Sequence, residues 1–297
     1  MALLDSITGI WRDPPPAIAF ELSEAGVASA RLGAKTELAF RALKPATISV
    51  SPLRDNVLVP DDLAVAVREA AMPNLKSKRR DAALIIPDYC TRIAVLDFDD
   101  FPSDAKEQLA LIRFRMKKSV PYDVESAALS FWPQHAGGKK HEVVVVVAPI
   151  EIVARYEAPL RAAGLNPGLV MPSSMAALHL MDSAGLTVVA KLTGHVLTVM
   201  VTDKGRLRLV RCLELAASTV SEVAADLYPT FVFVEDNLGA KAEKLLLCGF
   251  GALQEEARQI FAEELGIEVE AVRSPLGVPG ENDAGLLGYL RSVAVNN

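Results

Sequence analysis

Strand-like and helix-like patterns of hydrophobic residues alternate along the chain, and they are most regular between residues 82 and 122. Ala82 to Ile86 is a short apolar run that ends at Pro87-Asp88, and Thr91 to Phe98 is a second run of apolar and β-branched residues. Apolar runs of this length, bounded by turn residues, are typical of strands. We therefore predict that the two runs form a β-hairpin.

A helix is predicted directly after this hairpin. Ser103 offers an N-cap, apolar residues recur at helical spacing through Leu109, Ile112 and Met116, and Pro121 is expected to end the helix.

Two further apolar runs follow the helix, at residues 127–132 and 142–147. They are separated by a segment of turn-forming residues, which favours a second strand pair. Residues 82–149 are therefore expected to form a ββαββ module.

The segments on either side of this module repeat one pattern. A hairpin begins at Ala17, and three strands are predicted later in the chain, the last two joined by the hairpin signal Asp203-Lys-Gly205. Helices follow each group of strands. We interpret this as an internal duplication that gives two α/β lobes, one from residues 1–81 and 150–185, the other from residues 186–297.

Prolines predict two details of the helical regions. A proline inside a helix costs about 3 kcal/mol, so the helix expected from Ile150 to Ala163 should kink or break at Pro159. Leu165 to Met171 is expected to be an extended connection. A single helical segment, bent at Pro229, is predicted between the strands of the second lobe.

Composition and charge narrow the classes of function. The chain has 297 residues, of which 51% are hydrophobic and 23% charged, and this indicates a globular protein. A net charge of -6 argues against general nucleic-acid binding, which depends on a basic surface. The three scattered cysteines, Cys90, Cys212 and Cys248, predict buried thiols in a cytoplasmic protein.

Two segments suggest contacts with a membrane or a partner. Leu3, Ile7 and Trp11 fall on one face of a short amphipathic segment, which could lie on a membrane, dock on a partner or fold back on its own domain. The basic cluster at residues 76–80 could contact phosphates, but an exposed linker is the expectation we favour. No apolar run approaches the ~20 residues of a membrane-spanning helix.

Catalytic motifs are not found. The four histidines, at 135, 141, 179 and 195, lack metal-ligand spacing, and no Walker loop or nucleophile motif occurs. Asp97, Asp99 and Asp100 form the densest acidic cluster, and we expect them to be solvated. The Gly249-Phe-Gly251 turn follows a predicted strand, a setting that can hold a phosphate, but the third glycine of a dinucleotide fingerprint is missing.

The order of several local phrases resembles the type IV pilus assembly protein PilM family, which has an actin-like ATPase fold similar to that of FtsA. The phrases that carry the resemblance are Ile86-Pro87-Asp88, Val120-Pro121-Tyr122, Val143-Val-Val-Val-Val-Ala148, Ala163-Gly-Leu-Asn-Pro167, Leu245-Leu-Leu-Cys-Gly-Phe-Gly251 and Leu265-Gly-Ile-Glu-Val269. Their order extends over about residues 17–290.

The resemblance implies an α/β, actin-like (ribonuclease-H-like) fold of two lobes around an ATP and Mg²⁺ site. It also implies that the ββαββ module is a subdomain inserted in the first lobe. The partner it implies is the short cytoplasmic tail of a PilN-like inner-membrane protein, bound between the first lobe and that module. The protein would then be cytoplasmic and peripheral to the inner membrane, together with other pilus or secretion components, and a homo-oligomer is compatible with this role.

The sequence departs from the family at the phosphate hairpins. An aspartate followed two residues later by a glycine is expected at each hairpin, and here the pairs are Glu21 with Ser23 and Lys191 with Thr193. Glycine allows the backbone to approach phosphates closely, and lysine reverses the charge offered to Mg²⁺. With Gly249 and Gly251, these are the candidate nucleotide-binding residues, and we expect ATP binding to be weak or lost.

Three hypotheses follow from these observations. The first is a scaffold without catalytic residues that binds a PilN-like tail through the inserted module. Residues of that module proposed for the contact are Leu96, Phe98, Leu109, Arg113 and Met116, all of which are also candidates for its core. The second hypothesis is an actin-like ATPase with drifted motifs, and the third is a relative of the cytoplasmic domain of the type II secretion protein GspL.

Overall fold

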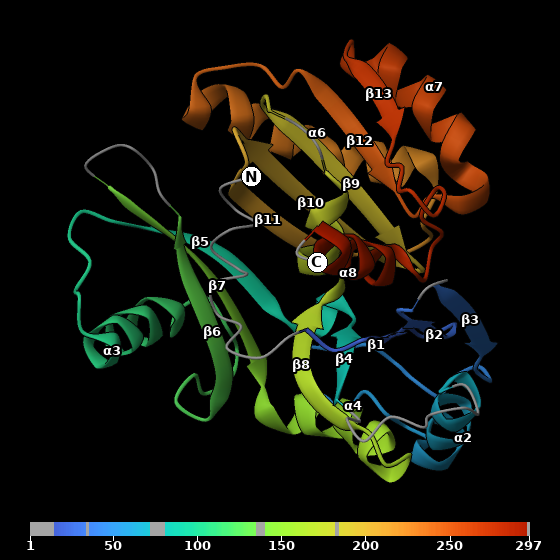
Figure 1. The fold of residues 1–297 in the computed structure, drawn as a ribbon. Helices are drawn as coiled ribbons and strands as arrows, with labels where there is room; N and C mark the ends of the chain where they lie inside the picture. Colours follow the sequence, from blue (N-terminus) through green and yellow to red (C-terminus); the bar gives the residue numbers. More distant parts are fainter. Residues whose placement is uncertain (1–14, 34–35, 72–80, 135–139, 182–183, 296–297) are drawn as a thin grey trace.

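The computed structural model describes residues 15–33, 36–71, 81–134, 140–181 and 184–295. It contains two five-stranded sheets with strand orders β3-β2-β1-β4-β8 and β11-β10-β9-β12-β13 (Figure 1). In each sheet the first three strands in sequence pair antiparallel and the remaining two join in parallel. The two sheets therefore share one topology, as expected from the repeated pattern of strands.

The strands and helices of the first lobe are β1 (Ile18–Leu22), β2 (Gly26–Arg31), β3 (Glu37–Ala42), α2 (Pro60–Ala70), β4 (Asp81–Ile86), α4 (Ile150–Ala162), β8 (Asn166–Pro172) and α5 (Ser173–Ala177), with short 3-10 turns η1 (Asp88–Cys90) and η2 (Leu178–Leu180). Helices α2 and α4 cover one face of the sheet, where Leu63, Tyr156 and Leu160 pack against Phe20 and Leu84.

The second lobe contains β9 (Thr187–Thr193), β10 (Val196–Asp203), β11 (Arg206–Glu214), α6 (Val220–Leu238), β12 (Lys244–Cys248), η3 (Gly251–Leu253), α7 (Gln254–Leu265), β13 (Glu268–Ala271) and α8 (Ala284–Val295). Helices α6 and α7 cover its outer face through residues such as Val223, Leu227 and Phe261. A single helix, α6, connects β11 to β12, as predicted.

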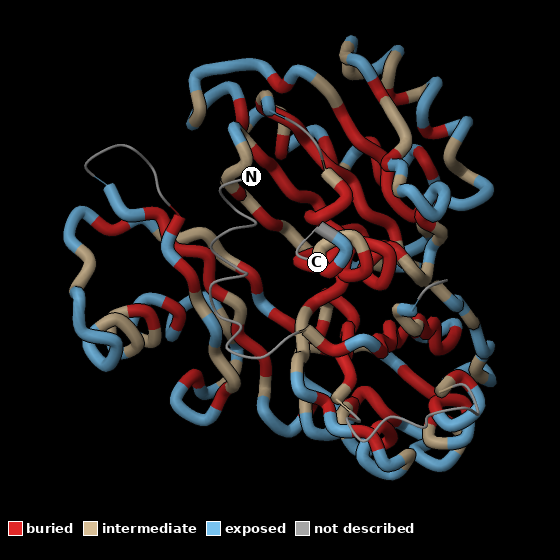
Figure 2. The backbone as a smooth tube through the Cα atoms, in the orientation of Figure 1, coloured by how far each residue is buried: buried red, intermediate tan, exposed pale blue. Residues whose placement is uncertain are grey.

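Helices α5 and α8 lie between the two sheets (Figure 1). Small residues allow this close packing. Gly285 and Gly288 face α5 and β4 so closely that an added Cβ would fall within 3 Å of Ile85, of Ser173 and of the backbone of Ala176. The inner faces of both sheets and these helices thus form one continuous buried core, which Figure 2 shows in red at the centre.

The inserted subdomain is a three-stranded sheet with the order β5-β7-β6, built from β5 (Arg92–Phe98), β6 (Ala127–Gln134) and β7 (His141–Pro149), and covered by α3 (Ala105–Met116). The predicted hairpin between residues 82–86 and 91–98 is wrong, because β4 pairs in parallel with β1 and β8 of the first lobe. The insertion therefore has one strand fewer than the expected ββαββ module.

Three smaller expectations are also corrected. Asp104, and not Ser103, caps α3, because its carboxylate accepts hydrogen bonds from the backbone of Lys106 and Glu107. The predicted connection at residues 165–171 is the edge strand β8. Helix α4 continues through Pro159 to Ala162, where only one turn remains after the proline.

The inserted sheet is held between α3 and the second lobe. One of its faces contributes Phe98, Val143 and Val145 to a core with α3. Its other face contributes Ile93, Trp132 and Val144 to the core shared by the two lobes.

Polar contacts fix the same arrangement of the inserted sheet. The Gln134 amide donates to the Leu207 carbonyl and accepts from its backbone N–H, both at 2.8 Å, while Glu142 binds Arg206 and Arg208 of β11. The insertion therefore contacts both lobes.

Candidate functional site

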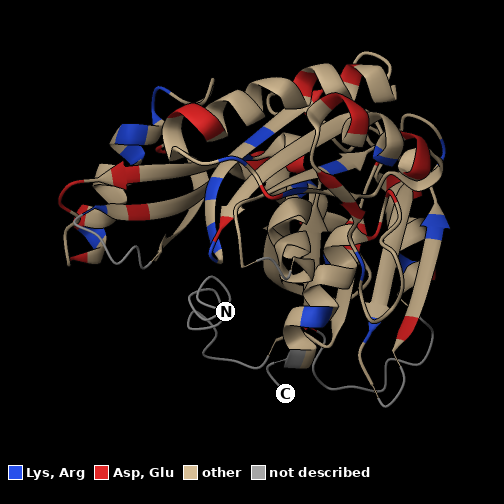
Figure 3. Cartoon of the chain, turned by 90° about the horizontal axis from the view of Figure 1, so that it is seen from above, with Lys and Arg blue, Asp and Glu red and all other residues tan. Residues whose placement is uncertain are grey.

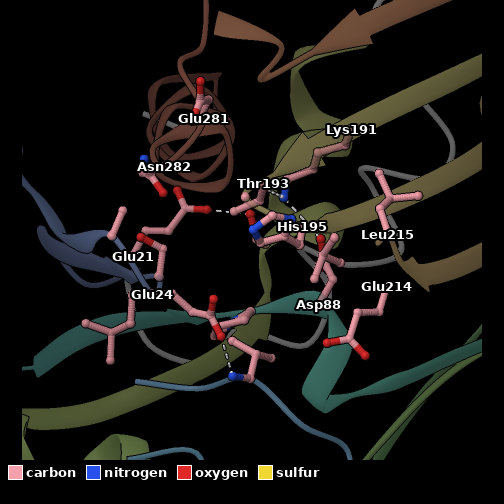
Figure 4. A pocket seen from close by; sticks show the side chains of 18 of the residues that line it. Glu21, Glu24, Asp88, Lys191, Thr193, His195, Glu214, Leu215, Glu281 and Asn282 are labelled. Atoms are coloured by element: carbon pink, nitrogen blue, oxygen red, sulfur yellow. Dashed lines mark hydrogen bonds and ion pairs between the residues drawn. The ribbon is translucent and has the colours of Figure 1, made fainter. Parts of the chain in front are cut away.

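A cavity of about 570 Å³ opens between the lobes, at the ends of the two hairpins (Figure 4). The β1–β2 turn and η1 approach it from the first lobe, and the β9–β10 turn approaches it from the second. Its lining residues are Glu21, Leu22, Ser23, Glu24, Ala25, Val50, Pro87, Asp88, Ser173, Lys191, Thr193, Gly194, His195, Val196, Glu214, Leu215, Ala216, Glu281 and Asn282. Four of the six predicted nucleotide-site residues, Glu21, Ser23, Lys191 and Thr193, are thus brought together.

A buried ion pair crosses this cavity from one lobe to the other. The Lys191 Nζ lies 3.1 Å from the Asp88 Oδ2, and each side chain is only 2% exposed. Lys191 also donates to the Thr193 hydroxyl at 2.9 Å. Because a buried charge is tolerated only when it is paired and hydrogen-bonded, the lysine at the second hairpin depends on the first lobe.

Asp88 is held in place by three elements. Its Oδ1 accepts the backbone N–H of Ser174 in α5 at 2.7 Å, and its Oδ2 also accepts the hydroxyl of Thr198 in β10 at 3.1 Å. From the sequence, Asp88 was a turn residue and part of the phrase Ile86-Pro87-Asp88, and it was not a predicted site residue. The sequence feature that could have pointed to an acidic partner was Lys191, because a lysine within an apolar strand requires a counter-charge.

Glu21 lies on the opposite wall, and each of its carboxylate oxygens accepts a hydrogen bond. One carboxylate oxygen accepts the Ser173 hydroxyl, and the other accepts the Leu286 backbone N–H of α8 at 2.7 Å. Burial raises the pKa of Glu21, and the nearby Lys191 opposes this rise. Burial lowers the pKa of Lys191, but Asp88 and Glu21 outweigh it and the net shift is upward.

The remaining charged groups give the cavity an acidic lining. Glu24, Glu214 and Glu281 add to Glu21 and Asp88, against the single ammonium of Lys191. Glu24 accepts the Val50 backbone N–H at 2.7 Å. Over the described chain as a whole, acidic and basic residues are interspersed (Figure 3). An excess of negative charge inside a narrow cavity opposes an anionic ligand.

These residues do not fit a Mg²⁺-nucleotide. The Glu21 oxygens already accept hydrogen bonds from Ser173 and Leu286, and the position that would offer the second carboxylate holds the Lys191 ammonium. In the described segments, no group of three or more His, Cys, Asp or Glu side chains is placed to hold a metal ion.

The two glycines predicted to contact a nucleotide are not among the residues that line the cavity. Gly249 and Gly251 adopt positive φ angles of 75° and 50°. A Cβ at Gly249 would clash with the Leu192 carbonyl, and one at Gly251 with the Glu281 carboxylate. Glycine is therefore required here so that the turn can pack against β9 and the segment before α8.

The residues proposed for partner binding lie mainly in the core of the inserted subdomain. Phe98 and Met116 are 5% and 0% exposed, and the half-buried Leu96 packs against the same core. Leu109 is half-buried on α3, and Arg113 donates to the Glu125 carboxylate at 2.8 Å. Phe98 and Met116 are therefore not available to a partner in this structure.

Of the other candidate residues that the structure describes, only His195 lines the cavity. Cys90, Cys212 and Cys248 are free thiols, and burial raises their pKa values, to about 12 for Cys212 and Cys248. His179 is buried and His141 is exposed at the start of β7. Asp97, Asp99 and Asp100 are exposed, as expected. His135, the amphipathic segment and the basic cluster at residues 76–80 lie outside the described residues.

No helix in the described parts of the chain is both long enough and apolar enough to cross a membrane. No protein-family model and no curated protein matches the sequence.

Solved structures do match the fold. A structure described as a PilM-PilN type IV pilus biogenesis complex is similar with a TM-score of 0.78 and 18% identity, over 93% of this chain and 98% of the other. A Bacteroides thetaiotaomicron protein with an actin-like ATPase fold and unknown function is similar with a TM-score of 0.59 and 12% identity, over 91% and 94% of the two chains.

The cytoplasmic domain of EpsL, an inner-membrane component of the type II secretion system of Vibrio cholerae, is similar with a TM-score of 0.50 and 13% identity, over 77% of this chain and 80% of that domain. Together with the two sheets of equal topology, these likenesses show that the chain has the two-lobed, actin-like ATPase fold.

Proposed function

We propose that this protein is a PilM-like scaffold that acts in the assembly of a type IV pilus or a related secretion machine by binding the tail of a PilN-like inner-membrane protein. The observation that carries the proposal is the fold likeness to the PilM-PilN complex, which extends over 93% of the chain. On this proposal the protein is cytoplasmic and reaches the inner membrane through its partner.

The geometry between the lobes supports a binding role over a catalytic one. Lys191 and Asp88 neutralise each other in the space between the hairpins, and five carboxylates line the cavity. A nucleoside triphosphate entering this cavity would lose its hydration and meet negative charges like its own. Both effects oppose binding. The proposed protein therefore recognises a peptide and does not hydrolyse ATP.

The first experiment measures binding of a synthetic PilN-like tail peptide by isothermal titration calorimetry. An Ile112→Asp variant places a charge in the fully buried core of the inserted subdomain, whereas Tyr228→Asp places the same charge at a 64% exposed site on the second lobe. We expect the peptide to bind the unmodified chain and the Tyr228 variant, and to bind the Ile112 variant at least 10-fold more weakly. No binding to the unmodified chain would refute the proposed partner.

The second experiment titrates the chain with a fluorescent ATP analogue in the presence of Mg²⁺. We expect no saturation in the micromolar range, because the carboxylates that would hold the metal are engaged or replaced. Micromolar affinity, or Mg²⁺-dependent phosphate release that Glu21→Ala abolishes, would instead support the ATPase hypothesis.

A role in type II secretion is the second candidate. The observation in its favour is the fold likeness to the EpsL cytoplasmic domain, which covers a smaller share of the chain than the likeness to the PilM-PilN complex. Pull-down with the cytoplasmic segments of the inner-membrane proteins of each machine would separate the two roles, because only one set should retain the chain.

A further inference from the structure

The outer edge of the first-lobe sheet is an unprotected strand. β3 lies at the end of its sheet, and in the described chain it pairs only with β2 (Figure 1). Five of its six residues are exposed, including Leu38 at 48% and Phe40 at 44%, and Figure 2 shows this edge at the surface. Natural edge strands often carry charged residues, proline or a bulge that blocks pairing. β3 has no lysine, proline or bulge, and its two charged residues, Glu37 and Arg41, are of opposite sign.

The direction of the backbone N–H and C=O groups of β3 follows from a hydrogen bond between the residues that adjoin β3 and β2. The Leu43 N–H donates to the Ala25 carbonyl at 2.9 Å, on the inner side of the edge. Because N–H and C=O groups alternate in direction along a strand, the backbone groups of Leu38, Phe40 and Ala42 point outward. The Arg41 side chain confirms this direction, since it donates to the Phe40 carbonyl at 3.0 Å.

The sequence of β3 is complementary to itself in an antiparallel pair. If Ala39 lies on a two-fold axis, Leu38 pairs with Phe40 of a second copy, and both residues have their backbone groups on the outer side. Glu37 then lies opposite Arg41 of the second copy, in the positions where paired side chains approach most closely. A shift of two residues in either direction would place Ala39 opposite one of these charges and leave them unmatched.

The side chains are already placed for this contact. Leu38 and Phe40 lie on one face of the strand, opposite Ala30 and Ala28 of β2 in the sheet register. The Phe40 ring lies over Gly26, where a Cβ would clash with it, so the glycine gives the ring its position beside the sheet. Besides its hydrogen bond to the Phe40 carbonyl, Arg41 has one weak ion pair, with Glu69 at 4.0 Å, and both of these side chains are about half exposed or more.

We propose that β3 is a dimerisation edge, through which two copies of this chain pair antiparallel and join their five-stranded sheets into one. The contact would add four backbone hydrogen bonds between Leu38 and Phe40 of the two copies, and two ion pairs between Glu37 and Arg41. It lies on the first lobe, no residue of β3 lines the cavity between the lobes, and the proposal does not depend on the pilus or secretion role.

The test is sedimentation velocity of the full chain over a range of concentrations. The unmodified protein should reach twice the 31.8 kDa of one chain. Arg41→Glu and Glu37→Arg should each raise the dimer dissociation constant about 10-fold or more, because like charges then face each other twice. An equimolar mixture of the two variants, or the double variant with both charges exchanged, should recover the dimer.

Lys241→Glu is the matched control, because it makes the same change of charge as Arg41→Glu at an 86% exposed side chain of the second lobe. Amide hydrogen exchange locates the contact independently, since Leu38 and Phe40 should be protected in the dimer and exchange rapidly in the Arg41 variant. A chain that stays monomeric, or a dimer that the charge variants do not change, would overturn the proposal.

Discussion

The hairpins that open the two sheets have the same topology and opposite charge. In the first lobe, β1 carries Glu21 toward the cavity, and in the second lobe β9 carries Lys191 toward it. Two carboxylates at these positions would repel each other unless a cation lay between them. With one lysine, the second lobe instead forms a direct ion pair with Asp88 of the first lobe.

This comparison shows how a small change can alter what a cleft does. The Lys191 ammonium supplies from within the chain the positive charge that a bound cation would otherwise supply. The lobes are thereby connected by internal polar contacts through Asp88, and by Leu286, whose backbone N–H reaches Glu21. The folded chain can therefore hold its two lobes together without a bound cation.

The largest predicted effect is that of Lys191→Met. The variant leaves Asp88 buried without its counter-charge, and loss of one partner of a buried pair costs about 3–5 kcal/mol. Urea unfolding followed by circular dichroism should show this loss in the free energy of unfolding. A second change, Asp88→Asn, should recover part of it, and a loss below about 1 kcal/mol in the single variant would contradict a role for the pair.

The second prediction concerns the apolar contact between the lobes, where His179 lies beside Leu178 and Leu180. Burial lowers the pKa of His179 from 6.5 to about 4, with Arg291 contributing. A lowered pKa means that stability is present above pH 6.5 and is lost as the pH falls toward 4, here by about 3 kcal/mol. Thermal unfolding of His179→Leu between these pH values should show a smaller slope than that of the unmodified chain.

A smaller effect is expected where the inserted sheet meets the second lobe. Glu142→Ala removes the partner of Arg206 and Arg208, and a hydrogen bond to a charged group contributes about 1.5–3 kcal/mol. Since both arginines are about one-fifth exposed, we expect a loss near the low end of this range. Hydrogen exchange in β11 should increase in the variant, and unchanged protection there would argue that the apolar contact alone holds the sheet.

The smallest effect is expected for Glu21→Gln, because the amide oxygen can still accept the Leu286 N–H, the amide nitrogen can donate to the Ser173 hydroxyl, and the side chain carries no buried charge. The change in stability should be within about 1 kcal/mol. The pH dependence of the free energy of unfolding distinguishes the Gln variant from the unmodified chain. A pKa raised above 4.5 means that Glu21 stabilises the fold below that pH and that this contribution is lost as the pH rises through the folded value. The Gln variant should lack this loss.

Local patterns in the sequence predicted most of the strands and the repeated topology, because hairpin signals such as Asp203-Lys-Gly205 act between neighbours in the chain. The assignment of β4 failed for the same reason. Pro87-Asp88 resembles a hairpin turn, but the partners of β4 are β1 and β8, which lie far away in the sequence. Parallel pairing leaves no local signal at the turn.

The candidate site was predicted in part. Glu21, Ser23, Lys191 and Thr193 were found through the resemblance of the hairpins, and all four line the cavity. Asp88, Ser173 and Thr198 were missed, since a single polar residue after a strand has no pattern of its own. Phe98 and Met116 could equally be core or surface from their spacing, and only the packing of α3 on β5 decides that they are core.

The position of α8 has a consequence for how the protein is made. The Tyr289 hydroxyl binds the Pro16 carbonyl, and the Leu286 N–H binds Glu21, contacts that span 273 and 265 residues. During synthesis the ribosome releases Glu21 long before α8, so the inner face of the first sheet lacks the part of its cover that α8 provides while β9 to β13 are translated. For that interval the nascent chain exposes an apolar sheet face, and its demand for a chaperone should be greatest just before α8 emerges.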